Sequence, residues 1–242
     1  MITFNGYRPV EDEETGERTY SRRTKYGLIS VIIHEVGHIY FPMTVNSDER
    51  QWTWMDEGLN TFLQFMAERE WEDGYPSRRG DPENITSYML SQNQVPIMTN
   101  SESILQFGNN AYGKPATALT ILRETVMGRD LFDFAFKEYS ERWMFKRPTP
   151  SDFFRTLEDA SAVDLDWFWR GWFYTTDHVD IALNDIREYS ISTQDPEIEF
   201  PIHREEEAEE PTSLTQIRNA DLPKRVEEFP ELEDLYNEND EF

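Results

Sequence analysis

Residues 21–41 read SRRTKYGLISVIIHEVGHIYF. The apolar side chains of this stretch recur at the spacing of one helix face: Leu28, Ile29, Ile32, Ile33 and Val36. The pattern predicts a helix over residues 21–41. Pro42 ends it, because proline lacks the backbone N–H that would continue the hydrogen bonding of a helix. This helix carries two of the chain's four histidines, His34 and His38.

The sequence that follows, up to position 185, also reads mainly as helices. Apolar periodicity, capping patterns and glycine or proline breaks predict the following segments: residues 54–71, a helix beginning at Asp81-Pro82-Glu83, one from about 113–115 to before Gly128, residues 130–145, a helix beginning at Thr149-Pro150, and residues 164–176. Phe134 and Trp167 are expected in the core. Residues 1–6 are the one good strand candidate. The expected fold is therefore mainly α, with a short N-terminal strand.

The C-terminal stretch differs in composition. Residues 186–242 hold 18 acidic and 5 basic residues, a net charge of −13, whereas the whole chain holds 48 and 23, a net charge of −25. Apolar residues in this stretch are few and lack a helical period. We predict two parts: a helical core over residues 1–185, and an acidic, extended, largely irregular tail or linker over residues 186–242.

The composition excludes several classes of function. A net charge of −25 disfavours non-specific binding to nucleic acid or to anionic membranes, which requires Lys and Arg. No apolar run approaches the roughly 18 residues that span a bilayer. The chain has no cysteine, so disulfides are excluded and any metal must be held by His, Asp or Glu.

The motif His34-Glu35-Val36-Gly37-His38 carries the chemistry. Residues four apart on a helix lie on one face, about 6 Å apart along the axis, so both imidazoles can reach one zinc ion. Glu35 follows the first ligand and can reach a water on that metal. Taken alone, the motif also fits a simpler interpretation, in which two helix histidines lie beside a solvated glutamate.

A catalytic zinc site usually has three protein ligands and a water, so two histidines leave one ligand to be found. Trp54-Met55-Asp56-Glu57-Gly58 offers a carboxylate at the head of the next predicted helix. Glu57 is the favoured third ligand, because a helix, a turn and a returning helix can bring it to the histidine pair. Asp56 is the rival, and it could instead accept a hydrogen bond from a ligand histidine.

This arrangement resembles the gluzincin aminopeptidases, the group that includes aminopeptidase N. The resemblance rests on H-E-x-x-H, an 18-residue gap and a glutamate in a W-x-x-E-G context, and it covers roughly residues 1–183. It implies the helical C-terminal part of a thermolysin-like catalytic domain. The segment Ala111-Tyr112-Gly113-Lys114-Pro115-Ala116 resembles the family's Tyr-x-Lys-Gly segment, which implies that Tyr112 stabilises the transition state. Lys114 is followed by proline where the family has glycine.

The resemblance implies zinc-dependent hydrolysis of a peptide substrate, with one zinc per chain held by His34, His38 and Glu57. A zinc-activated water would attack the scissile carbonyl, with Glu35 as general base. Tyr112 would donate a hydrogen bond to the developing oxyanion. We therefore predict a zinc metallopeptidase whose full-length parent is an aminopeptidase.

Family members carry a Gly-x-Met-Glu motif shortly before the zinc helix, and its glutamate binds the substrate's amino terminus. This motif is not found here, and neither is the family's N-terminal β domain. We expect a fragment of a longer protein, weakly active or inactive alone. The sequence leaves the compartment of the parent open among periplasmic, extracellular and cytoplasmic, with the first two favoured. Two alternatives stay open: an inactive helical scaffold stabilised by zinc, and a zinc hydrolase that acts on another bond, such as an epoxide.

Overall fold

A computed structural model of the chain describes residues 10–11, 18–19, 21–177, 179, 192–208 and 213–229. These residues fall into two units, one comprising residues up to 176 together with those from 222 onward, and the other comprising residues 177–221. The strand predicted over residues 1–6 lies outside the described residues. The boundary predicted after residue 185 also lies outside them, and the two-part division stays a prediction.

Helix α1 spans Arg22–Gly37 and carries the histidine motif. Ser21 caps its start, since the Ser21 hydroxyl accepts a hydrogen bond from the Thr24 amide at 3.2 Å. The helix ends earlier than the predicted residue 41. Glycine is a poor helix former, and after Gly37 the backbone tightens into a turn in which the Ile39 amide donates to the Val36 carbonyl at 3.0 Å. His38 is therefore the C-cap residue of α1.

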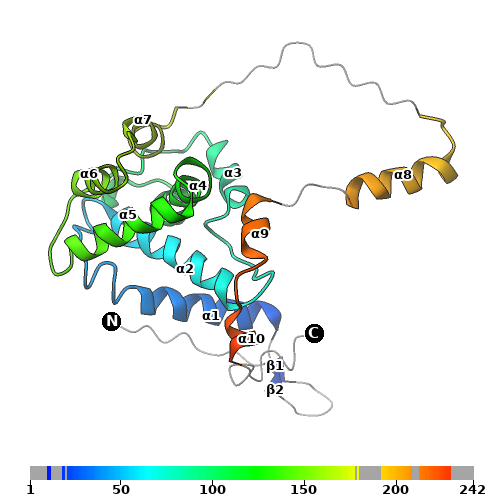
Figure 1. Ribbon diagram of the computed structural model, residues 1–242, viewed down its shortest axis with the longest axis horizontal. Helices are drawn as coiled ribbons and strands as arrows, with labels where there is room; N and C mark the ends of the chain where they lie inside the picture. The colour runs from blue at the N-terminus through cyan, green and yellow to red at the C-terminus, as the bar shows by residue number, and fades with distance from the viewer. Residues whose placement is uncertain are drawn as a thin grey trace. The chain divides into compact units, whose positions relative to one another are not determined.

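Helix α2 spans Glu57–Trp71 and ends where the sequence predicts. A short 3₁₀ segment, η1 (Thr53–Met55), precedes it and occupies the start of the predicted helix. Helices α1 and α2 lie side by side (Figure 1). Their contact is close at Gly37, where a Cβ atom would lie 2.0 Å from the Asn60 side-chain oxygen. The Asn60 side-chain amide also donates to the His34 carbonyl at 2.7 Å, so the histidine motif of α1 is hydrogen-bonded to α2.

The other elements of the first unit are short helices and turns. In chain order they are β1 (Val10–Glu11) and β2 (Arg18–Thr19), which pair antiparallel; η2 (Pro82–Ile85), α3 (Thr86–Met89), η3 (Ser101–Ser103), the π-helical η4 (Gly108–Gly113), α4 (Lys114–Ile121), the π-helical η5 (Leu122–Val126), α5 (Arg129–Arg142), α6 (Pro150–Ser161), α7 (Asp166–Trp169), the π-helical η6 (Arg170–Tyr174) and α10 (Arg225–Glu228). The predicted helix start at Thr149 is confirmed, whereas at Asp81 the 3₁₀ segment η2 begins and only then leads into the short helix α3. The expected mainly α fold is confirmed.

The core is rich in aromatic residues. Trp54 is fully buried and stacks on Phe154 with their rings 7° from parallel, and it meets Phe173 edge to face. Two expected core residues are instead exposed, Phe134 by 57% and Trp167 by 62%. On α5 the buried face holds Phe132, Ala135, Phe136 and Tyr139. Phe134 points the other way because it lies about 200° around the helix from Phe132.

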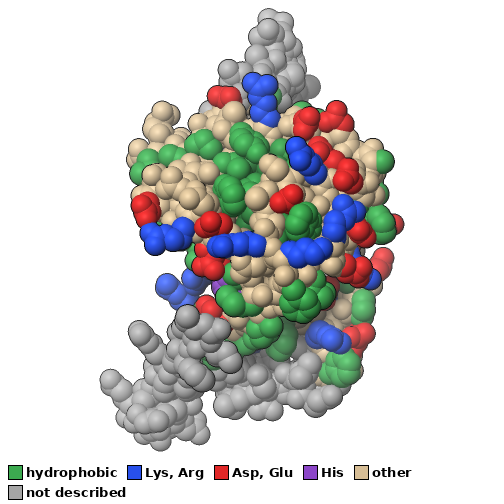
Figure 2. All heavy atoms as spheres, turned by 90° about the vertical axis from the view of Figure 1, so that its left-hand side faces the viewer, with side chains coloured by type: hydrophobic (Ala, Val, Ile, Leu, Met, Phe, Trp, Pro, Cys, Tyr) green, Lys and Arg blue, Asp and Glu red, His purple; other side chains and the backbone are tan. Residues whose placement is uncertain are grey.

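The apolar stripe of α1 is also more exposed than its pattern suggests. Ile32 is 53% exposed and Val36 is 59% exposed, while Tyr26 near the start of the helix is buried. Figure 2 shows one face of the molecule, on which basic side chains lie beside acidic ones and hydrophobic side chains form scattered patches. No helix among the described residues is both long and apolar enough to cross a membrane.

The tail prediction differs from the structure in one respect. Within residues 186–242, the described part includes three helices: α8 (Pro196–Ala208), α9 (Leu214–Asn219) and α10. Glutamate and arginine are good helix formers, so an acidic composition does not by itself prevent helices. Helix α9 also has a capping box, in which Ser213 and Gln216 exchange side-chain and backbone hydrogen bonds.

Candidate active site

Three metal-ligating side chains gather where α1 meets α2. His34 Nε2 lies 3.0 Å from Glu57 Oε2, and His38 Nε2 lies 3.4 Å from the same oxygen. One ligand atom from each of the three residues falls within 4.8 Å of the others. The two histidines come from the last turn of α1 and its C-cap, and Glu57 is the first residue of α2. The structure thus brings together the three residues that the sequence singles out as ligands.

The other ring nitrogen of each histidine already has a partner. His34 Nδ1 lies 2.9 Å from the Gln64 side-chain oxygen, and His38 Nδ1 lies 2.9 Å from the Phe41 carbonyl. Both acceptors fix Nδ1 as a donor, so Nε2 is the ring nitrogen that points toward Glu57 and the one available to a metal. Asp56 Oδ1 also lies 3.1 Å from His38 Nδ1, as expected if Asp56 orients a ligand instead of serving as one.

The local charges hold Glu57 ionised. Burial acts to raise its pKa, but hydrogen bonds from His34, His38 and Tyr112 outweigh it and lower the pKa to about 2. Burial acts to lower the pKa of His38, while the carboxylates of Asp56 and Glu57 raise it to about 10. Each carboxylate therefore stabilises positive charge here, and a divalent cation would gain from the same field.

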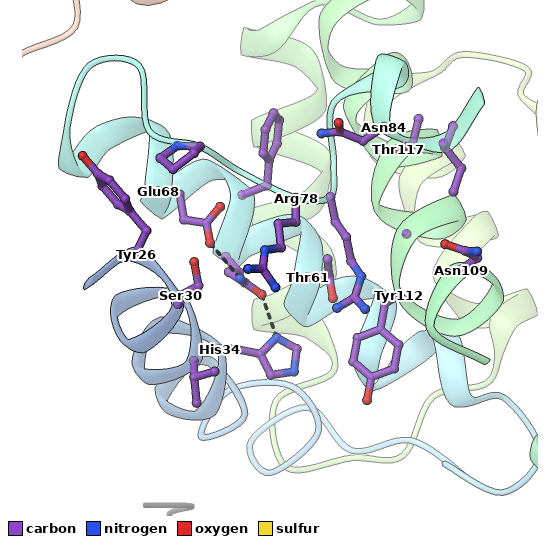
Figure 3. A pocket seen from close by; sticks show the side chains of 18 of the residues that line it. Tyr26, Ser30, His34, Thr61, Glu68, Arg78, Asn84, Asn109, Tyr112 and Thr117 are labelled. Atoms are coloured by element: carbon purple, nitrogen blue, oxygen red, sulfur yellow. Dashed lines mark hydrogen bonds between the residues drawn. The ribbon is translucent and has the colours of Figure 1, made fainter. Parts of the chain in front are cut away.

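A pocket of about 770 Å³ opens beside these residues. His34, Glu35 and Tyr112 all line it, and Figure 3 shows His34 and Tyr112 on its wall. The Tyr112 ring stacks on the His34 ring, with centroids 5.8 Å apart and planes 24° from parallel. Burial raises the pKa of Tyr112, so its hydroxyl stays a hydrogen-bond donor at neutral pH. The Glu35 carboxylate has no hydrogen-bond or ion-pair partner among the described residues.

The donor set fits zinc. Two imidazole nitrogens and one carboxylate oxygen form the ligand set of a catalytic zinc site, which leaves one position for water or substrate. The fit is supported by the contacts of the histidines, because each Nδ1 is already hydrogen-bonded and each Nε2 converges on the same carboxylate oxygen. A purely structural zinc site would usually supply a fourth protein ligand. The described residues provide three in this group.

Sequence reasoning missed several side chains around the site. Gln64 orients His34 and in turn donates to Glu68 at 2.7 Å, and both residues lie on α2. Relative to Glu57 as position i, Gln64 and Glu68 occupy positions i+7 and i+11, so helical spacing places them on its face and could have indicated them. Arg78 and Arg79 also line the pocket, from a loop with no periodicity to reveal them.

Comparison with known proteins gives the family. Residues 14–172 match the Peptidase family M1 domain. A glutamyl aminopeptidase of Sus scrofa is 26% identical over 199 residues, which cover 77% of this chain and 20% of that protein. A probable aminopeptidase 1 of Sulfurisphaera tokodaii is 26% identical over 195 residues, covering 76% of this chain and 24% of that protein.

The chain spans about a fifth of the length of the curated relatives it matches. The matched segment nonetheless includes all of the site described above, from His34 to Tyr112, and it covers most of the helical core. The gluzincin resemblance read from the sequence is confirmed, and the chain belongs to peptidase family M1.

Proposed function

We propose that this chain is the zinc-binding catalytic core of a metallopeptidase, and that the longer protein is an aminopeptidase. One observation carries the proposal: His34, His38 and Glu57 converge within 4.8 Å beside a pocket that Glu35 also lines. The family match and the names of the relatives support peptide hydrolysis as the reaction.

In this proposal His34, His38 and Glu57 hold the metal. Zinc, when bound, supplies a Lewis acid that polarises the scissile carbonyl and lowers the pKa of water. Gln64 and the Phe41 carbonyl keep the two imidazoles in one tautomer and one orientation. The geometry of the ligands is therefore set by the protein before any substrate arrives.

Glu35 acts as the general base. Glu35 lines the pocket and its carboxylate has no competing partner among the described residues, so it is available to take a proton from water. The same carboxyl group then delivers that proton to the nitrogen of the leaving amine. Proton transfer of this kind contributes about 10²–10⁴-fold to the rate.

Tyr112 donates a hydrogen bond to the oxyanion that develops on the scissile carbonyl. Its raised pKa keeps the hydroxyl protonated at neutral pH, and stacking against His34 keeps it near the metal ligands. In the structure this hydroxyl bonds Glu57, from which it would turn to the substrate. Removing a donor of this kind typically costs about 3 kcal/mol of transition-state stabilisation.

The metal site is tested by elemental analysis of the purified chain. We expect one zinc per wild-type chain, much less in Glu57→Ala, and no change in the matched control Glu102→Ala, which removes an exposed carboxylate outside the site. A folded wild-type chain that takes up no zinc from a supplied solution would contradict the proposal for this chain. The inactive scaffold predicted as the alternative would then be the better interpretation.

The catalytic part is tested with Glu35→Gln in the full-length protein. We expect this variant to keep its zinc and lose hydrolysis of aminoacyl substrates, a glutamyl substrate among them because relatives are named glutamyl aminopeptidases. Unchanged hydrolysis in Glu35→Gln would refute the role of Glu35. Zinc binding without any hydrolysis in the wild type would support the scaffold.

A further inference from the structure

The pocket beside the site gathers positive charge in a strongly acidic chain. Four arginines line it, Arg22 and Arg23 at the start of α1 and Arg78 and Arg79 in the loop after α2, although the chain's net charge is −25. None of the four forms an ion pair with a residue that the structure describes. Arginines elsewhere in the core are commonly paired, for example Arg123 with Asp133 at 2.6 Å.

Of the four arginines, Arg78 and Arg79 are the best candidates for a binding subsite. The Arg79 guanidinium sits over the Tyr112 ring, 4.7 Å from its centroid, and so contacts a residue of the proposed catalytic centre. Figure 3 shows the Arg78 side chain extending from its loop into the pocket. Both arginines keep a large exposed surface, so a ligand in the pocket can reach them.

The loop that carries them is fixed on both sides. Asp81 pairs with Arg69 of α2 at 2.6 Å, and Asn84 donates to the Ser77 carbonyl at 3.2 Å. Gly80 has a positive φ of 95° and lies against Phe65, where a Cβ atom would come within 2.4 Å of the ring. The two guanidinium groups therefore come from a loop whose conformation is fixed by these contacts.

No acidic side chain that the structure describes in the pocket forms an ion pair with Arg78 or Arg79. Glu68 is buried and accepts a hydrogen bond from Gln64, while Glu35 has no partner among the described residues. A guanidinium is always charged and offers a planar fork of N–H donors that matches a carboxylate. The guanidinium N–H donors of Arg78 and Arg79 therefore fit a carboxylate group of a ligand in this pocket.

We propose that Arg78 and Arg79 form a subsite that binds a carboxylate group of the peptide substrate. This inference rests on the proposed function, since it places the subsite in the pocket that the catalytic residues share. The carboxylate has two sources, an acidic side chain or the carboxyl terminus of the peptide. Both are recognised by the same fork of donors, and peptide design separates them.

The test measures peptide binding by calorimetry to the chain supplied with zinc and carrying Glu35→Gln, which prevents cleavage. Three probes differ in one group each: Glu-Ala-Ala amide, Gln-Ala-Ala with a free carboxyl terminus, and Gln-Ala-Ala amide with neither carboxylate. We expect one or both carboxylate peptides to bind at least about tenfold more tightly than the neutral peptide. The preferred peptide identifies the source.

Substitution then assigns the preference to residues. In the double variant Arg78→Gln with Arg79→Gln, the affinity for the carboxylate peptides should fall to that for the neutral peptide. The affinity for the neutral peptide should change little. Arg155→Gln removes one positive charge from an exposed position on α6 outside the pocket and should leave the preference intact. Urea unfolding of each variant shows that it is folded.

Three results would overturn the subsite. They are equal affinity of the parent chain for all three peptides, no binding of any peptide, and an equal loss of affinity for all three peptides in the arginine variant. Zinc content of the same samples keeps the two proposals apart. A chain that binds zinc without discriminating the peptides retains the proposed function and loses the subsite. A chain that discriminates them without binding zinc loses the function and retains the subsite.

Discussion

The contact between Gly37 and Asn60 predicts an energetic coupling between α1 and α2, the two helices that carry the proposed metal ligands. The Asn60 side chain is fully buried and its amide donates to the His34 carbonyl at 2.7 Å. Replacing it with alanine removes that bond at a cost of about 0.5–1.5 kcal/mol, while the His34 carbonyl keeps its bond from the His38 amide at 3.2 Å. Asn60→Ala should lower the free energy of unfolding by that amount.

Gly37→Ala acts through the same contact from the other side. The added Cβ atom would lie 2.0 Å from the Asn60 oxygen, far inside a normal carbon–oxygen contact. Overpacking of this kind costs about 1–3 kcal/mol, and the better helix propensity of alanine returns up to about 1 kcal/mol. In the double variant the overlap disappears while the propensity gain remains. The two changes should therefore be non-additive, with a coupling of about 1–3 kcal/mol.

Urea unfolding of the four proteins in the cycle measures this coupling. Chelator in every sample keeps metal binding out of the comparison, and equal m-values are required for it to be valid. Zinc affinity measured afterwards should fall in Gly37→Ala, because the overlap displaces the two histidines from Glu57, and should recover in part in the double variant. Additivity within about 0.5 kcal/mol, the scatter expected of independent sites, would refute the close contact as the structure shows it.

Three further predictions concern single positions. Glu57→Gln should lower zinc affinity at least about tenfold, since an amide oxygen carries no charge to offset the metal; competition with a metal-binding dye checks it. Gly58→Ala should destabilise the fold by about 1–3 kcal/mol, because the added Cβ atom would lie 2.6 Å from Pro115. Gly27→Ala should stabilise it by up to about 1 kcal/mol, because a Cβ atom there would have nothing within 4 Å. Urea unfolding should show changes of opposite sign in the free energy of unfolding for these two variants. Thr149→Ala should lower the melting temperature, through loss of a capping box worth about 1 kcal/mol, without changing zinc content.

Much of the site could be predicted because helix geometry is local. Two histidines four residues apart must share a face, and a carboxylate at the head of the next helix needs only a turn to reach them. The structure brings His34, His38 and Glu57 together as expected. Asp56, the rival, lies against the Nδ1 atom of His38, which is not the atom that faces Glu57. Their roles as ligands stay a prediction until metal is measured.

Other features depend on packing that no local pattern encodes. The sequence of α5 offers aromatic residues on more than one face, and only the neighbouring helices decide that Phe132 and Phe136 are buried while Phe134 is 57% exposed. The arginine pair in the pocket comes from a loop whose path is set by Gly80 and by contacts with α2. Short helices in the acidic tail escape a search for apolar periodicity because they bury little.

The closeness of the ligands along the chain has a consequence for folding. Glu57 begins the first α-helix after the one that carries the histidine motif, so the whole ligand set lies within one pair of adjacent helices. A metal held by all three side chains would act as a cross-link across a short loop, restricting the unfolded chain in the way a disulfide does. The entropy of closing so short a loop is small, and the helix pair that contains it has a low contact order. The candidate site is therefore placed where the chain can bring its residues together early, before the distant aromatic helices complete the core around Trp54.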